Sequence, residues 1–149
     1  MTGKVNVFLD TSALFAAVYS TQGGAFAILA LGQAEMLQII VSPQVLTEVE
    51  AAMRRKASEA LAALFLALDR SKLQVVAAPQ AQTIQKSHDL ISYLPDAVVL
   101  AAAWEANVDY FVTLDKQHFL DNTELKQALP FPVGTPGDFL AWFRGQLRP

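Results

Sequence analysis

Four acidic residues stand far apart in the sequence, each at the end or edge of an apolar segment: Asp10, Glu48, Asp96 and Asp115. Hard divalent cations prefer oxygen ligands, and Mg²⁺ usually binds a few carboxylates while keeping several waters. Carboxylates that pack together raise one another's pKa, and a bound cation reverses this cost. If the fold gathers these acids, we expect a site for Mg²⁺ or Mn²⁺ that is suited to phosphodiester hydrolysis.

Each aspartate also has a purely structural interpretation. Asp10 is placed to cap a helix that begins near Ser12, and Asp96 opens a helix, where capping or the helix dipole would favour an acid. Asp115 follows a strand, where a role in a turn or a cap is equally simple. The residues alone therefore leave both interpretations open for each aspartate.

The glutamate of the set is ambiguous as well. Glu48 and Glu50 both flank the apolar stripe of the same predicted helix, so periodicity does not choose between them. A solvated helix edge is the commoner place for such a residue.

The segment before Asp10 is the one on which the rest of the chain depends. Residues 5–9 form a short apolar run with little alternation, which is typical of a strand buried on both faces of a parallel sheet. Asp10 therefore lies at the carboxyl end of that strand. In open α/β sheets, ligands bind at this edge.

Strands and helices alternate along the rest of the chain. Further strands are predicted at residues 36–41, 73–77, 110–113 and 131–133, the last confined to a sheet edge or a strand start by its proline. Helices are predicted at residues 12–20, 25–34, 43 to about 54, 56–70, 80–92, 96–107 and 138–147. We therefore expect an α/β fold, a three-layer α/β/α arrangement with a mainly parallel central sheet.

The composition indicates a globular protein. The 149 residues suit one domain spanning 1–149, and the 53% hydrophobic content exceeds what a core needs, which favours a buried interface such as that of a homodimer. The longest apolar runs, residues 60–68 and 97–104, fall short of the roughly 20 residues that span a bilayer. With no signal-peptide pattern at the start and no cysteine, we expect a cytoplasmic protein without membrane segments, disulfides or thiolate sites.

The formal net charge of −3 argues against binding of nucleic acid through a broad, positively charged surface. It does not exclude an enzyme that acts on nucleic acid, because a carboxylate site lowers the net charge by itself. The compact basic cluster, Arg54, Arg55 and Lys56, suits the C-terminus of a helix, or alternatively contact with RNA phosphate or an acidic partner. Trp104 and Trp142 are interpreted as core or interface residues rather than platforms for nucleobases.

Four segments in this order resemble the PIN domain: residues 7–13, residues 42–48, residues 95–96 with the alanine-rich helix that follows, and residues 110–119. The resemblance covers nearly the whole chain, including residues 135–136 and 139–140 near its end. PIN domains are α/β/α folds, and many are ribonucleases that depend on Mg²⁺ or Mn²⁺. A large share of the small single-domain prokaryotic members are toxins of toxin–antitoxin pairs.

The resemblance implies that Asp10, Glu48, Asp96 and Asp115 are the catalytic metal ligands, and it selects Glu48 over Glu50. It also implies that two hydroxyl side chains, Ser12 and Thr113, orient the ligating carboxylates.

One departure from the family pattern follows the last aspartate. Many members carry another acid within a few residues, whereas this chain has Lys116, Gln117 and His118, and its nearest candidate is Asp121. The number of bound metal ions, one or two, therefore stays open. His118 could be a ligand or a proton donor, but within this segment it is interpreted as a residue that orients its loop.

Two functions follow from the sequence. The first is a metal-dependent endoribonuclease with an RNA substrate and a cognate antitoxin as its partner. The alternative is a non-catalytic PIN-like module that binds RNA or protein and keeps a vestigial metal site. An aspartyl phosphotransfer enzyme is disfavoured, because it would need a second acid at the position of Ser12.

Overall fold

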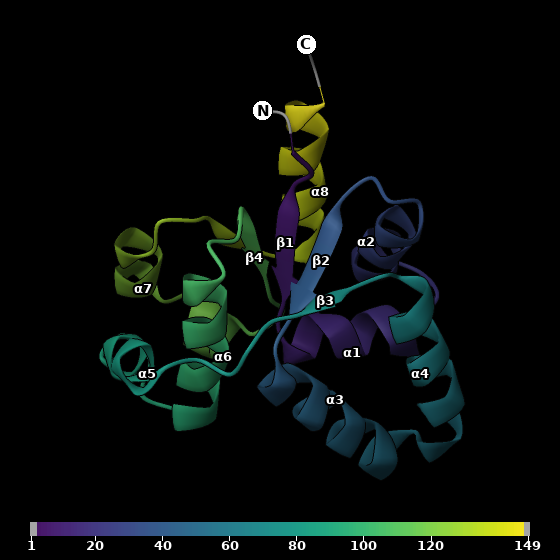
Figure 1. Ribbon diagram of the computed structural model, residues 1–149, viewed down its shortest axis with the longest axis horizontal. Helices are drawn as coiled ribbons and strands as arrows, with labels where there is room; N and C mark the ends of the chain where they lie inside the picture. Colours follow the sequence, from purple (N-terminus) through teal and green to yellow (C-terminus); the bar gives the residue numbers. More distant parts are fainter. Residues whose placement is uncertain (1–2, 148–149) are drawn as a thin grey trace.

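The computed structural model describes residues 3–147 and is built around a five-stranded sheet (Figure 1). Its strands are β1 (Asn6–Leu9), β2 (Gln38–Val41), β3 (Gln74–Val75), β4 (Tyr110–Val112) and β5 (Val133–Gly134). Their order is β3-β2-β1-β4-β5, and every neighbouring pair is parallel. The predicted α/β fold is confirmed. Because the chain leaves β1 toward β2 and later returns to its other side as β4, Asp10 lies at the switch point of the sheet, where ligands bind.

The central strand is apolar throughout because both its faces are covered. Val7, Phe8 and Leu9 are fully buried. Phe8 pairs in register with Phe111 of β4, and their rings stack with centroids 5.4 Å apart. This packing fixes β1 against β4 and so fixes the residues that follow each strand.

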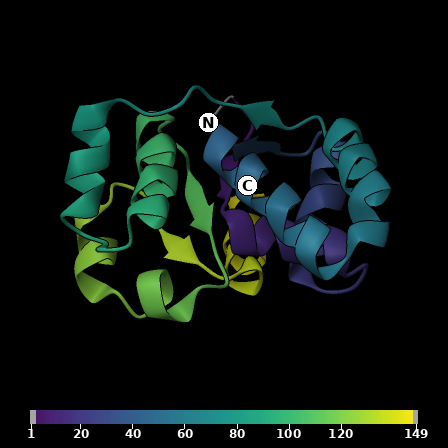
Figure 2. The same cartoon turned by 90° about the horizontal axis from the view of Figure 1, so that it is seen from below.

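Helices flank the sheet on both sides. The α-helices are α1 (Thr11–Tyr19), α2 (Gly24–Gln33), α3 (Pro43–Lys56), α4 (Leu61–Arg70), α5 (Ala81–His88), α6 (Leu94–Glu105), α7 (Thr123–Ala128) and α8 (Pro136–Gln146). A 3₁₀ turn, η1 (Ser58–Ala60), and a π turn, η2 (Lys116–Leu120), complete the described elements. Figure 2 shows α5 and α6 on one side of the sheet and α2 and α8 on the other, which gives the three layers.

Three helix starts follow capping signals in the sequence. The Ser42 side chain accepts a hydrogen bond from the N–H of Val45, ahead of Pro43. Thr135 and Asp138 form a reciprocal capping box at the start of α8. Asp10 caps α1, as its structural interpretation predicted.

Several predicted boundaries are wrong. The helix expected at residues 56–70 is interrupted: α3 runs on to Lys56, Ala57 leaves the helical region, and α4 begins at Leu61 after the 3₁₀ turn. The helix expected at residues 80–92 ends at His88. The next helix begins at Leu94 rather than at Asp96, because Pro95 is accepted within its first turn.

Among the described residues, no single helix is long and apolar enough to cross a bilayer. Helices α1 and α2 pass that test only when taken together, and they are bent by 85° at the break between them.

Candidate metal centre

Asp10 is the most buried acid of the candidate site. Its backbone N–H continues the sheet by donating to the carbonyl of Val112, 3.1 Å away. Its Oδ1 accepts hydrogen bonds from the N–H of Ala13 at 2.9 Å and the hydroxyl of Ser12 at 2.7 Å, and its Oδ2 accepts from the hydroxyl of Thr113 at 2.5 Å. Asp10 is therefore both the cap of α1 and a fixed carboxylate at the end of the sheet.

The two hydroxyl side chains connect Asp10 to the loop after β4. Ser12 Oγ accepts the N–H of Leu114 at 3.0 Å, and Thr113 Oγ1 accepts the N–H of Asp115 at 3.0 Å. Each hydroxyl thus donates to Asp10 and accepts from the neighbouring loop. This arrangement holds Asp10 and Asp115 in a fixed relation, which is the geometry expected of groups that orient metal ligands.

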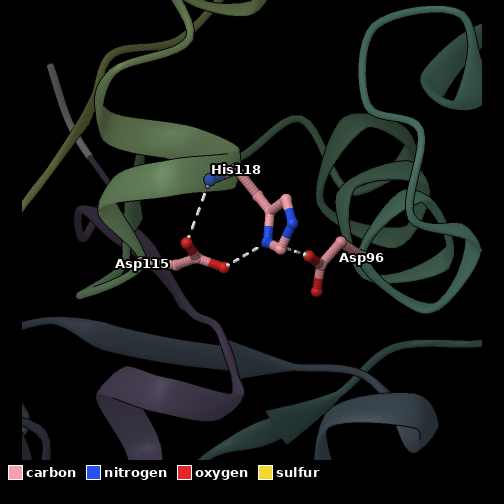
Figure 3. Close-up of side chains that lie close together, drawn as sticks. All are labelled: Asp96, Asp115 and His118. Atoms are coloured by element: carbon pink, nitrogen blue, oxygen red, sulfur yellow. Dashed lines mark hydrogen bonds and ion pairs between the residues drawn. The ribbon is translucent and has the colours of Figure 1, made fainter.

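Asp96 and Asp115 lie on opposite sides of the His118 ring (Figure 3). Asp115 caps η2, with its Oδ1 accepting the backbone N–H of His118 at 3.0 Å. The Nδ1 of the same histidine lies 2.9 Å from Asp115 Oδ2 and 3.1 Å from Asp96 Oδ2. These three side chains come close enough together to share one cation.

One carboxylate oxygen of this group accepts no hydrogen bond. Asp96 Oδ2 is buried and has no hydrogen-bond partner among the described residues, since the hydrogen bond of His118 Nδ1 goes to Asp115. A buried carboxylate oxygen that accepts no hydrogen bond is costly, and here only the nearby His118 Nδ1, 3.1 Å away, offsets the cost. Asp96 stands in the first turn of α6, but its side chain does not cap the helix, so the capping interpretation is wrong. Its place near the positive end of the helix dipole is as expected.

Glu48, and not Glu50, faces the site. Its Oε1 accepts the hydroxyl of Thr11, its Oε2 accepts Gln44 Nε2 at 2.8 Å, and its charge raises the pKa of Asp96. Glu50 instead lies 3.9 Å from Arg54 on the outer face of α3. The structure therefore makes the distinction that helical periodicity leaves open.

A pocket of about 130 Å³ opens between these elements. It is lined by Asp10, Thr11, Ser12, Asp96, Val99 and Asp115. Glu48 is not among the lining residues, but it accepts a hydrogen bond from Thr11, which is one of them.

The site carries an excess of negative charge. Burial raises the pKa of Asp10 to about 6, although hydrogen bonds from Thr113, Ala13 and Ser12 oppose the change. Burial also raises the pKa of Asp96 to about 6, where His118 opposes it and the nearby carboxylates reinforce it. A cation would relieve both effects. The Asp96 oxygen that accepts no hydrogen bond, the oxygen-rich donor set and this charge together fit a hard divalent cation.

His118 has more contact with the site than its sequence interpretation implies. It does hold its loop, through its backbone N–H and Nδ1 on Asp115, and this hydrogen bond raises its pKa. It also offers a ring nitrogen between two acids, which only its spacing from Asp115 could have signalled. Asp121 is exposed and lies outside the group of potential ligands found among the described residues.

The other singled-out residues lie away from the pocket. Arg54, Arg55 and Lys56 form the exposed last turn of α3, where positive charge suits the helix dipole. Trp142 packs against Tyr110 and Phe139, as a core interpretation predicts.

Comparison with known sequences identifies the family. The profile of the PIN domain matches residues 6–117 of the chain. The chain therefore belongs to the PIN domain family, as its four acidic segments suggested. No curated protein sequence matches it.

Solved structures share the fold at low sequence identity. PAE2754 from Pyrobaculum aerophilum is 19% identical with a TM-score of 0.64, over 95% of this chain and 97% of that one. VapBC2 from Rickettsia felis, bound to a DNA fragment from their promoter, is 19% identical with a TM-score of 0.61, over 87% and 97%. Mycobacterium tuberculosis VapC20, described as a sarcin–ricin loop cleaving toxin, is 16% identical with a TM-score of 0.52, over 74% and 91%.

Proposed function

We propose that the protein is an endoribonuclease that depends on Mg²⁺ or Mn²⁺ and hydrolyses RNA phosphodiester bonds at the pocket between β1, α6 and the loop after β4. The observation that carries the proposal is the buried Asp96 oxygen that accepts no hydrogen bond and has only His118 Nδ1 beside it, in a pocket lined by Asp10 and Asp115. Membership of the PIN family and the likeness to an RNA-cleaving toxin support it.

In this proposal, Asp10, Asp96, Asp115 and Glu48 hold the cation and are the catalytic residues. When bound, the cation lowers the pKa of a water and stabilises negative charge on the leaving oxygen. Asp10 keeps its orientation through Ser12 and Thr113, so its carboxylate is ready without rearrangement. Glu48 is held between Thr11 and Gln44 and adds a further negative charge from α3 beside Asp96.

The two glutamates of α3 provide a matched test. We expect Glu48→Gln to lower cleavage of single-stranded RNA in Mn²⁺ by about tenfold or more, because it removes a charge beside Asp96. Glu50→Gln, on the outer face of the same helix, leaves the rate within about twofold. Initial rates with and without a chelator make the measurement. Absence of metal-dependent cleavage in the wild type, on any RNA, would contradict the proposal.

Thr113 gives a second test. We expect Thr113→Val to weaken Mn²⁺ binding about 10- to 100-fold, because Asp10 loses the hydroxyl that orients it. Thr113→Ser keeps the hydroxyl and retains the affinity. Calorimetric titration measures both, and thermal unfolding verifies that each variant folds. Equal affinities for the two variants would show that the hydroxyl has no role in metal binding.

We further propose that the protein is the toxin of a cytoplasmic toxin–antitoxin pair and forms a homodimer. Its likeness to the VapBC2 structure supports an antitoxin partner. Two exposed apolar side chains, Phe26 and Leu66, line a groove of about 330 Å³ between α1, α2 and α4. Growth arrest on expression, relieved by a neighbouring gene product, and a dimeric mass in solution are the expected results.

The alternative is a non-catalytic module. It is favoured by the absence of a late acid at residues 116–118, where His118 occupies the space beside Asp96. Metal binding without cleavage of any RNA supports this alternative.

A further inference from the structure

Tyr93 is an exposed aromatic residue at the edge of the candidate metal centre. Its side chain is 54% exposed, although it stands directly before α6, the helix that carries Asp96. Its ring lies on the ring of His118, with centroids 5.8 Å apart and planes inclined by 14°. His118 in turn contacts Asp115 and Asp96, so the aromatic pair continues the site outward from its acids.

We propose that Tyr93 is a positioning residue on which a nucleobase of the RNA substrate stacks, next to the phosphate held at the metal centre. The proposal rests on the proposed ribonuclease function and names the residue that would seat the substrate there. One face of the ring rests on His118, and the side chain remains largely open to solvent.

The charge of the protein favours this kind of contact. With a net charge of −3 and a site lined by carboxylates, the molecule gains little from general attraction of phosphates. Stacking on an aromatic ring does not depend on positive charge and is strong enough to change RNA affinity about tenfold or more on removal of one ring. Tyr93 is an exposed aromatic residue in direct contact with His118, which itself contacts Asp96 and Asp115.

There is also room for the rest of the nucleotide. A pocket of about 420 Å³ is lined by His118 together with residues from the end of α5 and from η2. Its lining includes His88, Ser92 and Gln117, which offer polar groups beside the aromatic pair. A single strand that crosses His118 therefore meets a stacking surface at Tyr93 and polar side chains next to it.

The test compares three variants on single-stranded RNA. Tyr93→Ala should raise KM about tenfold and leave kcat within about twofold, because the ring acts on binding and touches no reacting atom. Tyr93→Phe should restore KM, because it keeps the ring. Leu94→Ala is the matched control: the neighbouring side chain is 52% exposed, and its removal should change KM less than twofold. Thermal unfolding of each variant checks the fold.

A binding measurement separates this inference from the proposed function. RNA that carries 5-iodouridine at successive positions is irradiated with the wild-type protein in Mn²⁺, and mass spectrometry locates the cross-link. A cross-link to Tyr93 from one position supports the inference even if no RNA is cleaved, in which case only the ribonuclease proposal fails. Cross-links confined to other residues overturn the inference even if cleavage is observed. A fall in kcat at constant KM in Tyr93→Ala also overturns it, as does an equal loss in Leu94→Ala.

Discussion

Asp10→Asn should lower RNA cleavage by about hundredfold or more while the domain stays folded. The asparagine oxygen can still accept the N–H of Ala13 and cap α1, because Asn and Asp are similarly good caps. The charge that faces the pocket is lost. Initial cleavage rates and thermal unfolding of the same preparations measure the two effects.

Asp121→Asn is the control for loss of one carboxylate in the same part of the protein. Asp121 is exposed and outside the group of potential ligands, so its variant should cleave within about twofold of the wild-type rate. Full activity in Asp10→Asn, or a comparable loss in both variants, would contradict the assignment of Asp10.

The second large effect is a dependence of metal-free stability on pH. Asp10 and Asp96 have a pKa of about 6 in the folded protein and an ordinary value of 3.8. Between these values the folded state binds more protons than the unfolded chain, so the free energy of unfolding falls as pH rises through this window. Asp10, which is buried, contributes at most about 3 kcal/mol to the fall, and the partly exposed Asp96 contributes less because solvent screens it. The raised pKa of His118 acts in the same direction.

We therefore expect the melting temperature in a chelator to be higher at about pH 5 than at about pH 7.5. Mn²⁺ at a hundred times its Kd should add about 2.7 kcal/mol at the higher pH, which corresponds to roughly 5–10 °C for a protein of this size. Asp96→Asn should flatten the pH profile and reduce the response to Mn²⁺. A metal-free melting temperature that rises over this range would refute the assignment of buried, mutually repelling acids.

The sequence predicted elements correctly where the local hydrophobic and capping signals agree with the packing of the sheet. The apolar run before Asp10 predicted both a buried strand and its emergence at the binding edge, and the helix predicted from residue 43 begins there as α3. The last helix, α8, begins at Pro136, two residues before its predicted start. Glu48 is different. Its choice over Glu50 depends on contacts with Thr11 and Gln44 that helical periodicity does not encode.

Residues 116–128 show what local patterns miss. No element was predicted there, yet η2 and α7 form because Asp115 and Asn122 cap them and Phe119 and Leu125 are buried. Asn122 also donates to the carbonyl of Leu90, a distant contact that fixes this segment against the end of α5. The same long-range packing brings His118 to Asp96, which explains why its place in the site was underestimated.

The most direct test of the metal centre is an anomalous difference map from crystals of the wild-type protein grown with Mn²⁺. We predict a peak in the pocket lined by Asp10, Asp96 and Asp115, at about 2.0–2.6 Å from carboxylate oxygens of at least two of them. If Mn²⁺ saturates the protein but its peak lies elsewhere, and Asp96 Oδ2 still accepts no hydrogen bond, the proposed metal centre is contradicted.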